Sequence, residues 1–530
     1  MVPSQPINGE KAAAVSKHCV RPAIVLVADR TLSARYKILF EGMFATMQTT
    51  QVPERIMRSL VSPRMKTDPA GRAHAAALGI RRLEAALIDH IGLDPNEVVC
   101  TTPEILPKLL GPWTKVVGVS SSDPLGRGMS NTTTKNFWKG ELYTKVWTER
   151  MMQQIRRARD KYGFKVVAGG AGAWQWVGDK QITEQQGIDT VFEGYGEFAG
   201  VQLFRDILAG REPPPYACQS TTAAESIRPI RGASFIGIIE ISRGCGRGCR
   251  FCTLSDKKMA HLSHDTILSD IETNLANGIT SVVSGSEDLF RYGSDGIHVQ
   301  FEPLHGLLSE MKQLKGLSFM QIDHANVTSV LQLTDEQLQE IRSLLTWQKP
   351  SKFLWVNLGV ESANGRLVAA ASKAKVAPFQ PDDWADMVRE TVHRLSRCGF
   401  FPVLSIVLGL PGETPDDVQC TLDLVNELSQ KQPMVVFPVF YEPYRSDEIQ
   451  NDMRFGMEKF RLDHLELYST CYEINFRWVP KLFWDNQRAG GVSLAKRVLM
   501  RLLGKTEVRA WRKRFQLLQQ ELSQKSSSVR

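Results

Sequence analysis

Residues 241–252 have the sequence ISRGCGRGCRFC, in which Cys245, Cys249 and Cys252 are spaced as C-x3-C-x2-C. The apolar run 235–241 leads into this loop and has the composition of a buried parallel strand. Thiolates are the usual protein ligands of iron–sulfur clusters, and a glycine-rich loop is flexible enough to wrap three of them around one cubane. Three thiolates leave one iron of a [4Fe–4S] cluster open to a substrate. The sequence therefore predicts a catalytic metal centre at the end of a strand.

Two other interpretations start from the same three cysteines. One is a structural zinc site, and the other is a set of ordinary buried thiols. Structural zinc is held by four ligands, and no fourth Cys or His lies close in sequence at a suitable spacing. We therefore favour the iron–sulfur cluster.

The chain after the cysteine loop alternates between apolar runs and amphipathic segments. The expected strands are 235–241, 281–283, 318–322, 354–360, 402–408 and 434–440, and the expected helices are 264–277, 302–315, 334–346, 382–398 and 416–430. Six parallel strands joined by crossover helices predict a partial (β/α)6 barrel of the TIM type. The active site of such a barrel lies at the carboxyl ends of its strands.

A second α/β pattern precedes the barrel. Apolar runs at 22–30, 116–120 and 165–168 alternate with amphipathic segments at 71–92 and 141–162, and glycine-rich turns follow the strands. This pattern predicts a Rossmann-like, doubly wound α/β domain.

The predicted organisation has five parts. They are a disordered lead-in (1–20), the Rossmann-like domain (21–210), a linker with three consecutive prolines (211–232), the barrel (233–445) and a basic helical C-terminal extension (446–530). Hydrophobic residues make up 42% and charged residues 23% of the 530, which is typical of globular proteins. Nine cysteines are too few for a secreted disulfide scaffold. With no signal-like N-terminus and no apolar run of about 18 residues, we expect a cytoplasmic protein.

The net charge of +8 is concentrated near the C-terminus. Residues 477–530 hold 13 Lys or Arg and three acids, so the rest of the chain is slightly acidic. Between 492 and 503, apolar residues repeat at helical spacing with cations on the other faces, and Trp478, Trp484 and Trp511 lie nearby. A basic amphipathic helix of this kind is typical of an element that contacts a membrane surface. The alternatives are a helix packed on the barrel with a solvated basic face, and a nucleic-acid patch.

The C-x3-C-x2-C motif resembles the defining motif of the radical S-adenosylmethionine (SAM) superfamily. In that family the open iron binds the amino and carboxylate groups of SAM, and reductive cleavage yields a 5′-deoxyadenosyl radical. Gly285, Ser286 and Glu287 resemble the family's GGE motif, which binds the SAM amino group, although Ser286 replaces the second glycine. A carboxylate suits that position because an ammonium group needs an acceptor. Taken alone, a Gly-Ser-Glu segment is usually only a turn.

Two further segments at predicted strand ends resemble the same family. Glu361 and Ser362 resemble the strand-four motif near the SAM ribose and carboxylate; the alternative is a helix start with Ser362 or Asn364 as its N-cap. SIVLGLPG (405–412) resembles the adenine-binding G-x-I-x-G-x-x-G strand, with serine at the first glycine. The resemblance makes these further residues SAM contacts: Val407 in the place of isoleucine, Gly409, Gly412, and the aromatic Phe251 between the last two cysteines.

Residues 22–210 resemble the cobalamin-binding-type domain that precedes the barrel in one branch of this superfamily. The matching segments are VGVSSSDP (117–124), VVAGGAG (166–172) and DTVFEGYGE (189–197). No D-x-H-x-x-G motif occurs, so the resemblance implies cobalamin without a histidine ligand from below, or a domain that only covers the active site. The residues expected at the cofactor are Ser120, Ser122, Gly169, Gly170 and Gly172.

The resemblance implies a radical SAM enzyme that C-methylates an unactivated carbon of a small, hydrophobic, lipid-like or pigment-like molecule with cobalamin. Its partners would be that substrate, an electron donor of the flavodoxin or ferredoxin type, and a membrane surface, but no nucleic acid. Cyclisation, C–C coupling or rearrangement are the outcomes without methyl transfer. A methylthiotransferase would carry three more cluster cysteines in the N-terminal domain, where only Cys19 and Cys100 occur, with Cys218 in the linker. A non-catalytic iron–sulfur protein leaves the SAM-binding segments unexplained.

Overall fold

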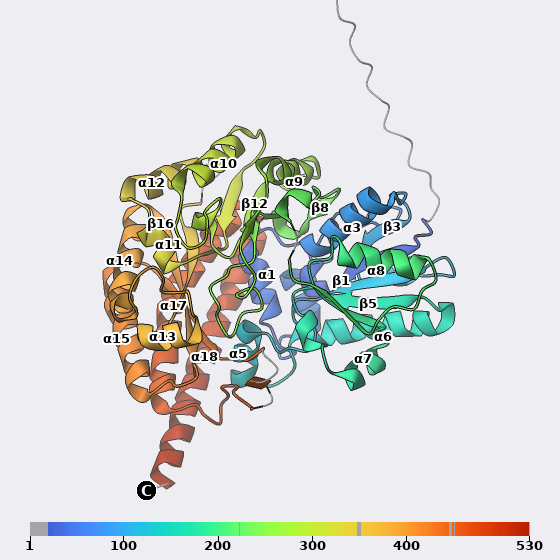
Figure 1. Cartoon of the computed structure of the whole chain (residues 1–530). Coiled ribbons are helices and arrows are strands. Elements are labelled where there is room, and N and C mark those ends of the chain that lie inside the picture. The colour runs from blue at the N-terminus through green and yellow to red at the C-terminus, as the bar shows by residue number, and fades with distance from the viewer. Residues whose placement is uncertain (1–19, 222, 347–350, 445–447, 450, 529–530) are drawn as a thin grey trace, which may run out of the picture.

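The computed structural model describes residues 20–528 apart from 222, 347–350, 445–447 and 450 (Figure 1). The first half forms a six-stranded sheet in which all neighbouring strands are parallel. The strand order is β3 (Val98–Thr101), β1 (Ile24–Ala28), β4 (Val116–Ser120), β5 (Lys165–Gly169), β6 (Thr190–Gly194) and β7 (Tyr216–Gln219). This is a doubly wound order, and its switch point lies between the carboxyl ends of β1 and β4.

Helices cover both faces of this sheet. On one face, α3 (Leu78–Ile91) and α8 (Ala199–Leu208) pack against alternate residues of β1 such as Leu26. On the other face, α4 (Leu106–Leu109) and α6 (Tyr143–Tyr162) pack against the intervening residues such as Val25. Because both faces are covered, β1 is buried along its whole length and reads as an unbroken apolar run. The predicted Rossmann-like domain is confirmed.

Two segments of the first half differ from expectation. The helix expected over 71–92 begins at Leu78, because the residues before it form β2 (Ala75–Ala76), which pairs with β8 (Ala233–Ser234). The expected linker 211–232 contains β7, the edge strand beside β6. The prolines that suggested a linker directly precede this strand, where their missing N–H groups break no sheet hydrogen bond.

The second half forms an open barrel of parallel strands. One sheet has the order β13 (Phe319–Ile322), β12 (Ser281–Gly285) and β9 (Ile238–Glu240). The other has the order β14 (His324–Ala325), β15 (Leu354–Glu361), β16 (Phe400–Leu408) and β17 (Val435–Phe440). Since β13 and β14 are separated only by Asp323, they are two parts of the third barrel strand. All six expected strands are therefore present, which confirms the partial barrel.

Helices cover the outside of this barrel (Figure 1). They are α9 (His264–Ala276), α10 (Phe301–Gln313), α11 (Val327–Leu331), α12 (Asp335–Leu344), α13 (Gly365–Ala371), α14 (Trp384–Arg397) and α15 (Pro415–Lys431). Short elements elsewhere are α2 (Glu54–Ile56), α7 (Lys180–Gln186), β10 (Ser242–Arg243) and β11 (Ala260–His261). The five predicted barrel helices match α9, α10, α12, α14 and α15 to within three residues.

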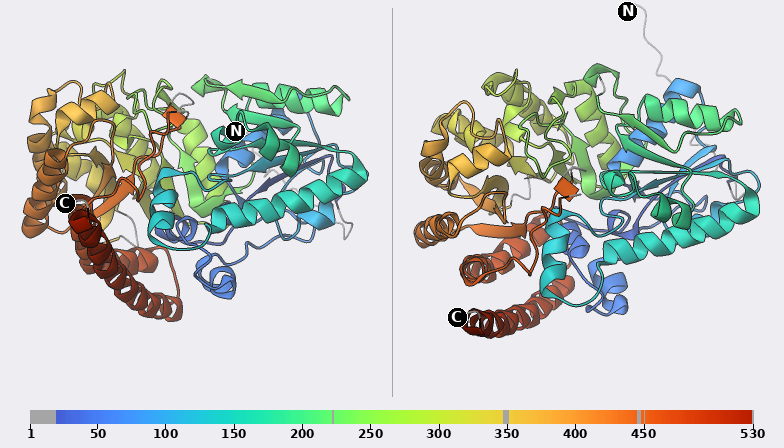
Figure 2. Two further views of the ribbon diagram at one scale, coloured as in Figure 1. Left: turned by 90° about the horizontal axis from the view of Figure 1, so that it is seen from below. Right: turned by 60° about the horizontal axis from the view of Figure 1, so that its bottom comes forward.

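Parts of the chain outside the barrel complete its core. From the N-terminal half, α1 (Leu39–Thr46) and α5 (Met129–Phe137) contribute Phe40 and Phe137 to it. From the C-terminal extension, α17 (Leu462–Ala489) packs on β17 and α15, and α18 (Leu494–Ser528) packs on α17. Figure 2 shows α18, in dark red, along the outside of the molecule. Within the described residues, no helix is both long and apolar enough to span a bilayer.

Candidate active site

The cysteine loop follows β9 and β10 and curls back on itself. Gly244, Gly246 and Gly248 all have φ between 70° and 74°, in the left-handed region that favours glycine. At Gly244 a Cβ atom would also lie 2.5 Å from the carbonyl oxygen of Lys258. The alternating glycines therefore turn the loop so that Cys245 and Cys249 can lie on one side of it.

A buried arginine fixes this loop to the barrel. The Arg247 guanidinium donates to the Asp288 carboxylate (3.1 Å), to Ser329 Oγ (3.0 Å) and to the carbonyl oxygen of Ala374 (3.1 Å). Asp288 follows β12, Ser329 lies in α11 and Ala374 follows α13, so one side chain ties the loop to three segments. The arginine itself is almost fully buried.

Backbone contacts hold the rest of the loop. Cys249 forms an isolated antiparallel bridge with Ser372, and the Arg250 N–H donates to the carbonyl oxygen of Ala371 (2.9 Å). Ser255 Oγ donates to the carbonyl oxygens of Cys249 (2.7 Å) and Cys252 (2.8 Å). The cysteines therefore sit on a backbone whose conformation is set by the surrounding protein.

The three thiols share one partly buried environment. Burial raises the pKa of Cys245 to about 11 and that of Cys252 to about 12, and the neighbouring cysteines and Glu287 add to both shifts. The free Cys245 and Cys252 thiols are therefore protonated at neutral pH, so binding of a cationic cluster must release their protons. Among the described residues, no three His, Cys, Asp or Glu side chains converge as ligands of a single metal ion. In a cubane each thiolate binds a different iron atom.

The residues expected to bind the SAM amino group lie at the end of β12, beside the thiols. Burial raises the pKa of Glu287, and within the described part of the chain its carboxylate accepts no hydrogen bond. Ser286 is held in place by Ser242, whose Oγ lies 2.5 Å from its own Oγ. A Cβ at Gly285 would lie 2.8 Å from the Ile239 carbonyl oxygen on β9. Glu287 is thus a half-buried carboxylate next to a metal-binding loop, and the nearby His324 ring is a charged neighbour that lowers its pKa.

Glu361 at the end of β15 has a partner that the sequence did not reveal. It has a left-handed φ of 64° and forms a buried ion pair with Lys375. The pair fills the space above Gly359, where a Cβ would lie 2.3 Å from Lys375 Nζ. Burial lowers the pKa of Lys375, but Glu361 and the nearby Cys249 thiol more than offset this, so the net shift is upward. Lys375 is therefore a buried cation beside the cysteine loop.

Ser362 does not share this position. Its hydroxyl lies 3.3 Å from Thr421 Oγ1 and accepts from the Asn364 N–H (3.1 Å), so it packs the start of α13 against α15. Asn364 is the N-cap of α13, accepting from the N–H groups of Arg366 and Leu367. The interpretation of this segment as a helix start therefore accounts for Ser362 and Asn364 but not for Glu361.

Two of the three residues predicted to contact adenine, Val407 and Gly409, pack against other parts of the protein. Gly409 has φ 78°, and a Cβ there would lie 2.1 Å from the Phe455 ring, which packs over it. Gly412 also has a positive φ. A Cβ there would lie 3.9 Å from the Leu367 side chain, so the space beside Gly412 is open. Val407 is buried on β16 in register with Val439 of β17.

Phe251, between Cys249 and Cys252 in the sequence, packs against the segment that follows β17. Its ring contacts Tyr441 edge-on at 6.3 Å, and the Tyr441 hydroxyl donates to Glu448 (2.5 Å). Glu448 also pairs with Arg250 (2.6 Å), so these contacts join the loop to the segment that follows β17.

The third barrel strand brings two further polar groups to this end. His324 Nδ1 lies 3.1 Å from the Asp323 carboxylate. Burial lowers the pKa of His324, but Asp323 and Glu287 outweigh it and raise the pKa to about 9, so the ring is cationic at neutral pH. Gln321, three residues before His324, is 1% exposed, and neither polar atom of its amide has a hydrogen-bond partner among the described residues. An unpaired buried amide is unfavourable, so Gln321 is suited to a polar ligand or a water molecule.

At the glycines expected to contact cobalamin, the space beside the backbone is filled by other protein atoms. A Cβ at Gly170 would lie 2.6 Å from Ser120 Oγ, and one at Gly172 would lie 2.7 Å from the Ser122 carbonyl oxygen. The turn after β5 therefore packs directly on the loop after β4. Gly169 ends β5, and a Cβ there would lie 3.2 Å from the Phe192 carbonyl oxygen on β6.

Asp123 organises the loop after β4, a role that the sequence analysis missed. Its buried carboxylate accepts from the N–H groups of Arg127 (2.7 Å) and Gly128 (2.9 Å) and from the amides of Asn131 and Gln175 (2.8 Å each). The signal was present, because an aspartate before a Pro-x-Gly segment favours a turn.

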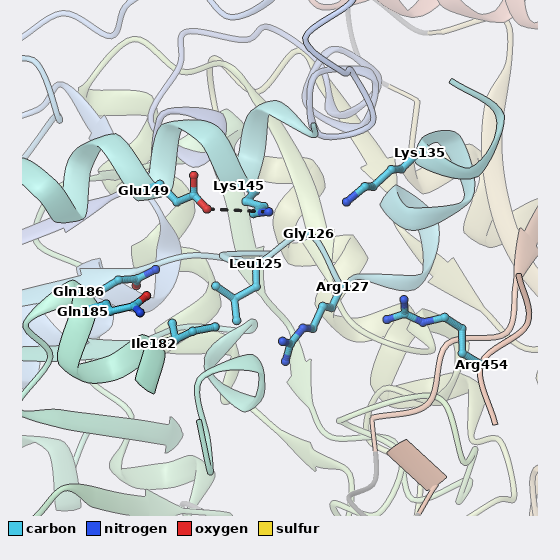
Figure 3. Close-up of a pocket in the computed structure, with 10 residues that line it drawn as sticks. All are labelled: Leu125, Gly126, Arg127, Lys135, Lys145, Glu149, Ile182, Gln185, Gln186 and Arg454. Atoms are coloured by element: carbon cyan, nitrogen blue, oxygen red, sulfur yellow. Dashed lines mark ion pairs between the residues drawn. The ribbon is translucent and has the colours of Figure 1, made fainter. Parts of the chain in front are cut away.

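A cavity of about 370 Å³ opens beside this loop (Figure 3). It lies between the loop after β4, α5, α6 and α7, and Arg454 reaches it from the segment after β17. Its charged lining residues are Arg127, Lys135, Lys145, Glu149 and Arg454. Lys135 and Lys145 each pair with Glu141 at 2.9 Å. The cavity is thus formed by both halves of the molecule at the carboxyl edge of the N-terminal sheet.

Buried ion pairs fix the two halves to each other. Arg82 of α3 pairs with Asp270 of α9 (2.5 Å), and Glu197 after β6 pairs with Arg243 of β10 (2.8 Å). Tyr195 lies over the Arg243 guanidinium at 4.2 Å, and burial raises its pKa. The G-x-G-E turn after β6 therefore faces the start of the cysteine loop.

Comparison with known proteins identifies the barrel. The family model for the radical SAM superfamily matches residues 239–425. The probable threonylcarbamoyladenosine tRNA methylthiotransferase of Methanocaldococcus jannaschii is 23% identical over 197 residues, which are 37% of this chain and 42% of that protein. The ribosomal protein uS12 methylthiotransferase RimO of Thermosipho africanus is 23% identical over 266 residues, 48% of this chain and 57% of that protein. The chain thus spans only about half the length of these curated relatives.

The fold extends the likeness to most of the chain. The solved structure of the radical SAM methyltransferase TsrM from Kitasatospora setae, with tryptophan and a SAM analogue bound, has a TM-score of 0.52 at 14% identity and covers 81% of this chain and 76% of its own. The structure of TsrM with cobalamin and a [4Fe–4S] cluster has a TM-score of 0.53 at 15% identity, with 81% and 78% covered. Residues 239–425 therefore match the radical SAM superfamily, and the two α/β halves of the chain have the fold of TsrM.

Proposed function

We propose that this protein is a cobalamin-dependent radical SAM methyltransferase that methylates an unactivated carbon of a small molecule. The observation that carries the proposal is the pairing of the cysteine loop with Glu287. Three thiols lie on a loop pinned by Arg247, and the carboxylate beside them accepts no hydrogen bond in the described protein, with the His324 ring as its charged neighbour. A SAM ammonium group would donate hydrogen bonds to this carboxylate.

The residues around the thiols have distinct roles in this proposal. Cys245, Cys249 and Cys252 would bind three irons of a [4Fe–4S] cluster, and Glu287 would bind the SAM amino group. Lys375 would offset the negative charge of the thiolates from beneath, since Cys249 is among the groups that raise its pKa. When bound, the cluster supplies the electron that cleaves SAM, and cobalamin supplies a methyl group. An external donor of the flavodoxin or ferredoxin type would deliver the electron.

Two polar side chains of the barrel interior could bind a polar group on an otherwise apolar substrate. Gln321 offers an unpaired donor and acceptor, and His324 offers a cation at neutral pH. The strands around them bury apolar side chains such as Val403 and Val435, and Asn357 adds a partly exposed amide beside His324. A lipid-like or pigment-like substrate would place a hydrogen-bonding or anionic group at these polar side chains.

The carboxyl edge of the N-terminal sheet fits cobalamin in part. The cavity there is walled by both halves and lined with hydrogen-bonding and cationic side chains, which suits the amides and phosphate of such a cofactor. Ser120 and Ser122 lie at this edge, whereas Gly170 and Gly172 pack against the loop after β4. We therefore propose Ser120 and Ser122, rather than Gly170 and Gly172, as cofactor contacts, with the cavity holding only a part of the cofactor.

The first experiment tests the cluster and SAM sites. Protein reconstituted anaerobically should hold roughly four irons per chain and release 5′-deoxyadenosine under strong reductant. The Cys245→Ala/Cys249→Ala/Cys252→Ala variant should lose both, and Cys420→Ser, which changes an exposed cysteine on α15, should lose neither. A wild-type protein that binds iron but never cleaves SAM would instead be a non-catalytic iron–sulfur protein.

The second experiment tests methyl transfer. Turnover with cobalamin and a cell extract should yield both 5′-deoxyadenosine and S-adenosylhomocysteine. Ser122→Trp should lower cobalamin retention, measured by its visible absorbance after gel filtration, while Ser130→Trp on the exposed side of α5 should not. Deoxyadenosine without S-adenosylhomocysteine would favour cyclisation, coupling or rearrangement and would refute methyl transfer.

The likeness to methylthiotransferases supports a second candidate, which the sheet order disfavours. Such an enzyme would carry a second cysteine cluster in the N-terminal domain. Cys100 is buried on β3 and Cys218 is exposed on β7, at opposite edges of the sheet. Five strand spacings of about 4.8 Å separate them by roughly 24 Å. Cys19 lies outside the described residues. Roughly eight irons per chain would favour this second candidate.

A further inference from the structure

The apolar side chains of α18 are buried in one half of the helix and exposed in the other. In the second half, Trp511, Phe515 and Leu518 are buried against α17 and α5, with Trp511 4.5 Å from the ring of Tyr472. In the first half, four apolar side chains form an exposed set that we term the outer stripe. Their exposed fractions are 60% for Leu494, 44% for Val498, 46% for Leu499 and 55% for Leu502.

The first half of α18 is nevertheless fixed on the protein. Lys496 pairs with the buried Glu41 of α1 at 2.7 Å, and Arg497 lies over the Trp484 ring at 4.4 Å. At the turn before the helix, a Cβ on Gly490 would lie 2.4 Å from Ile38, so the chain passes very close to α1. These contacts hold one side of the helix inward and therefore direct the outer stripe away from the body.

Cationic residues continue the same outer face toward the C-terminus. Arg501, Lys505, Arg509 and Lys513 follow one another at intervals of four residues and are all exposed, although the Arg501 guanidinium also lies over the Trp484 ring at 5.5 Å. In the described structure, Lys505, Arg509 and Lys513 form no ion pair. Because α18 has a 3.6-residue period, these residues lie beside and beyond the outer stripe on one side of the helix.

We propose that this face of α18 docks on an anionic lipid bilayer. The leucines and valine of the outer stripe would enter the boundary between headgroups and acyl chains, and the cations would contact lipid phosphates. A nucleic acid would use the cations but would leave four apolar side chains without a role. The proposal goes beyond the chemistry of the barrel and holds whether or not the enzyme methylates its substrate.

The test is co-sedimentation of the full chain with vesicles of phosphatidylcholine alone and with about one third phosphatidylglycerol. The wild type should bind the anionic vesicles and not the neutral ones. Each cation near the surface contributes about fivefold to partitioning, so Arg501→Gln/Lys505→Gln/Arg509→Gln should weaken binding about 100-fold. Leu499→Gln/Leu502→Gln should weaken it about tenfold or more.

A matched control lies in the N-terminal half. Val177 is 41% exposed and lies on a different element from α18, so Val177→Gln should bind as the wild type does. All these positions are exposed, and unchanged melting temperatures would exclude unfolding as the cause. Absence of vesicle binding by the wild type would overturn the proposal, as would RNA binding that the leucine variant retains in place of vesicle binding. A failure of SAM cleavage would leave this test unaffected.

Discussion

The cysteine loop and the turn after β5 are both rich in glycine, but Gly246 in the first and Gly172 in the second have different structural roles. In the cysteine loop, Gly246 has a left-handed φ and no protein atom nearer than 3.9 Å to its Cβ position. In the turn after β5, Gly172 has an ordinary φ and lies within 2.4 Å of Pro124 by the same measure. The first glycine shapes a loop around a space, and the second allows two loops of the protein to touch.

This difference separates two uses of one sequence signal. Where protein atoms occupy the Cβ position of a glycine, close packing accounts for the choice of glycine. Where that position is open, the glycine leaves room for a ligand. The cluster site therefore has local support from glycine geometry, and the cobalamin site depends on the cavity instead.

The largest expected effect concerns the buried pair beneath the cysteine loop. Lys375→Met leaves Glu361 buried without a partner and should lower the free energy of unfolding by about 3–5 kcal/mol. The double variant Glu361→Gln/Lys375→Met should recover much of that loss. Urea denaturation of the protein without cluster measures both. Equal stability of the single variant and the wild type would mean that the loop does not depend on this pair.

The next effect compares the two kinds of glycine directly. Gly172→Ala should lower the free energy of unfolding by about 3 kcal/mol, because its Cβ would overlap a proline ring and a backbone carbonyl. Gly246→Ala should lower it by only about 1 kcal/mol, the contribution of its left-handed φ. The same denaturation curves apply. A reversed order would break the distinction between a packed turn and an open loop.

A smaller effect concerns ligand binding in the open loop. Glu287→Gln removes the negative charge but keeps the shape of the side chain, so SAM affinity should fall about tenfold with the iron content unchanged. Isothermal titration of the reconstituted protein with SAM measures the affinity. Loss of iron in this variant would show that Glu287 supports the cluster rather than SAM.

The smallest expected effect is a change in how the stability of the fold depends on pH. The pKa of His324 is raised to about 9, so the stabilisation from its protonated form is complete below the unfolded value near 6.5 and is lost as pH rises through 9. Asp323→Asn removes the main cause of the shift and should flatten this decline between pH 6.5 and 9. The melting temperature measured across that range tests the point, and an unchanged slope in the variant would assign the decline to another group.

Much of the fold followed from the sequence because the strands are buried on both faces and read as apolar runs. The cysteine spacing and Glu287 likewise lie within short segments. The residues missed act across long separations. Arg247 reaches Asp288 and Ser329, and Lys375 joins Glu361 from beyond a helix. Their partners cannot be recognised until the chain has folded, and a lone lysine or arginine has no pattern of its own. The assigned domain boundaries and the SAM and cobalamin contacts stay predictions.

The packing of α5 on the barrel limits how this protein can be divided or recombined. Thr133 of α5 accepts the N–H of Phe440 on the edge strand β17 (2.9 Å), and Phe137 stacks on Tyr468 of α17 at 4.4 Å. A gene fragment that encodes only 233–445 would lack both helices and expose that edge to other chains. A chimera that exchanges the barrel between relatives must therefore include α5 and α17 together with the barrel.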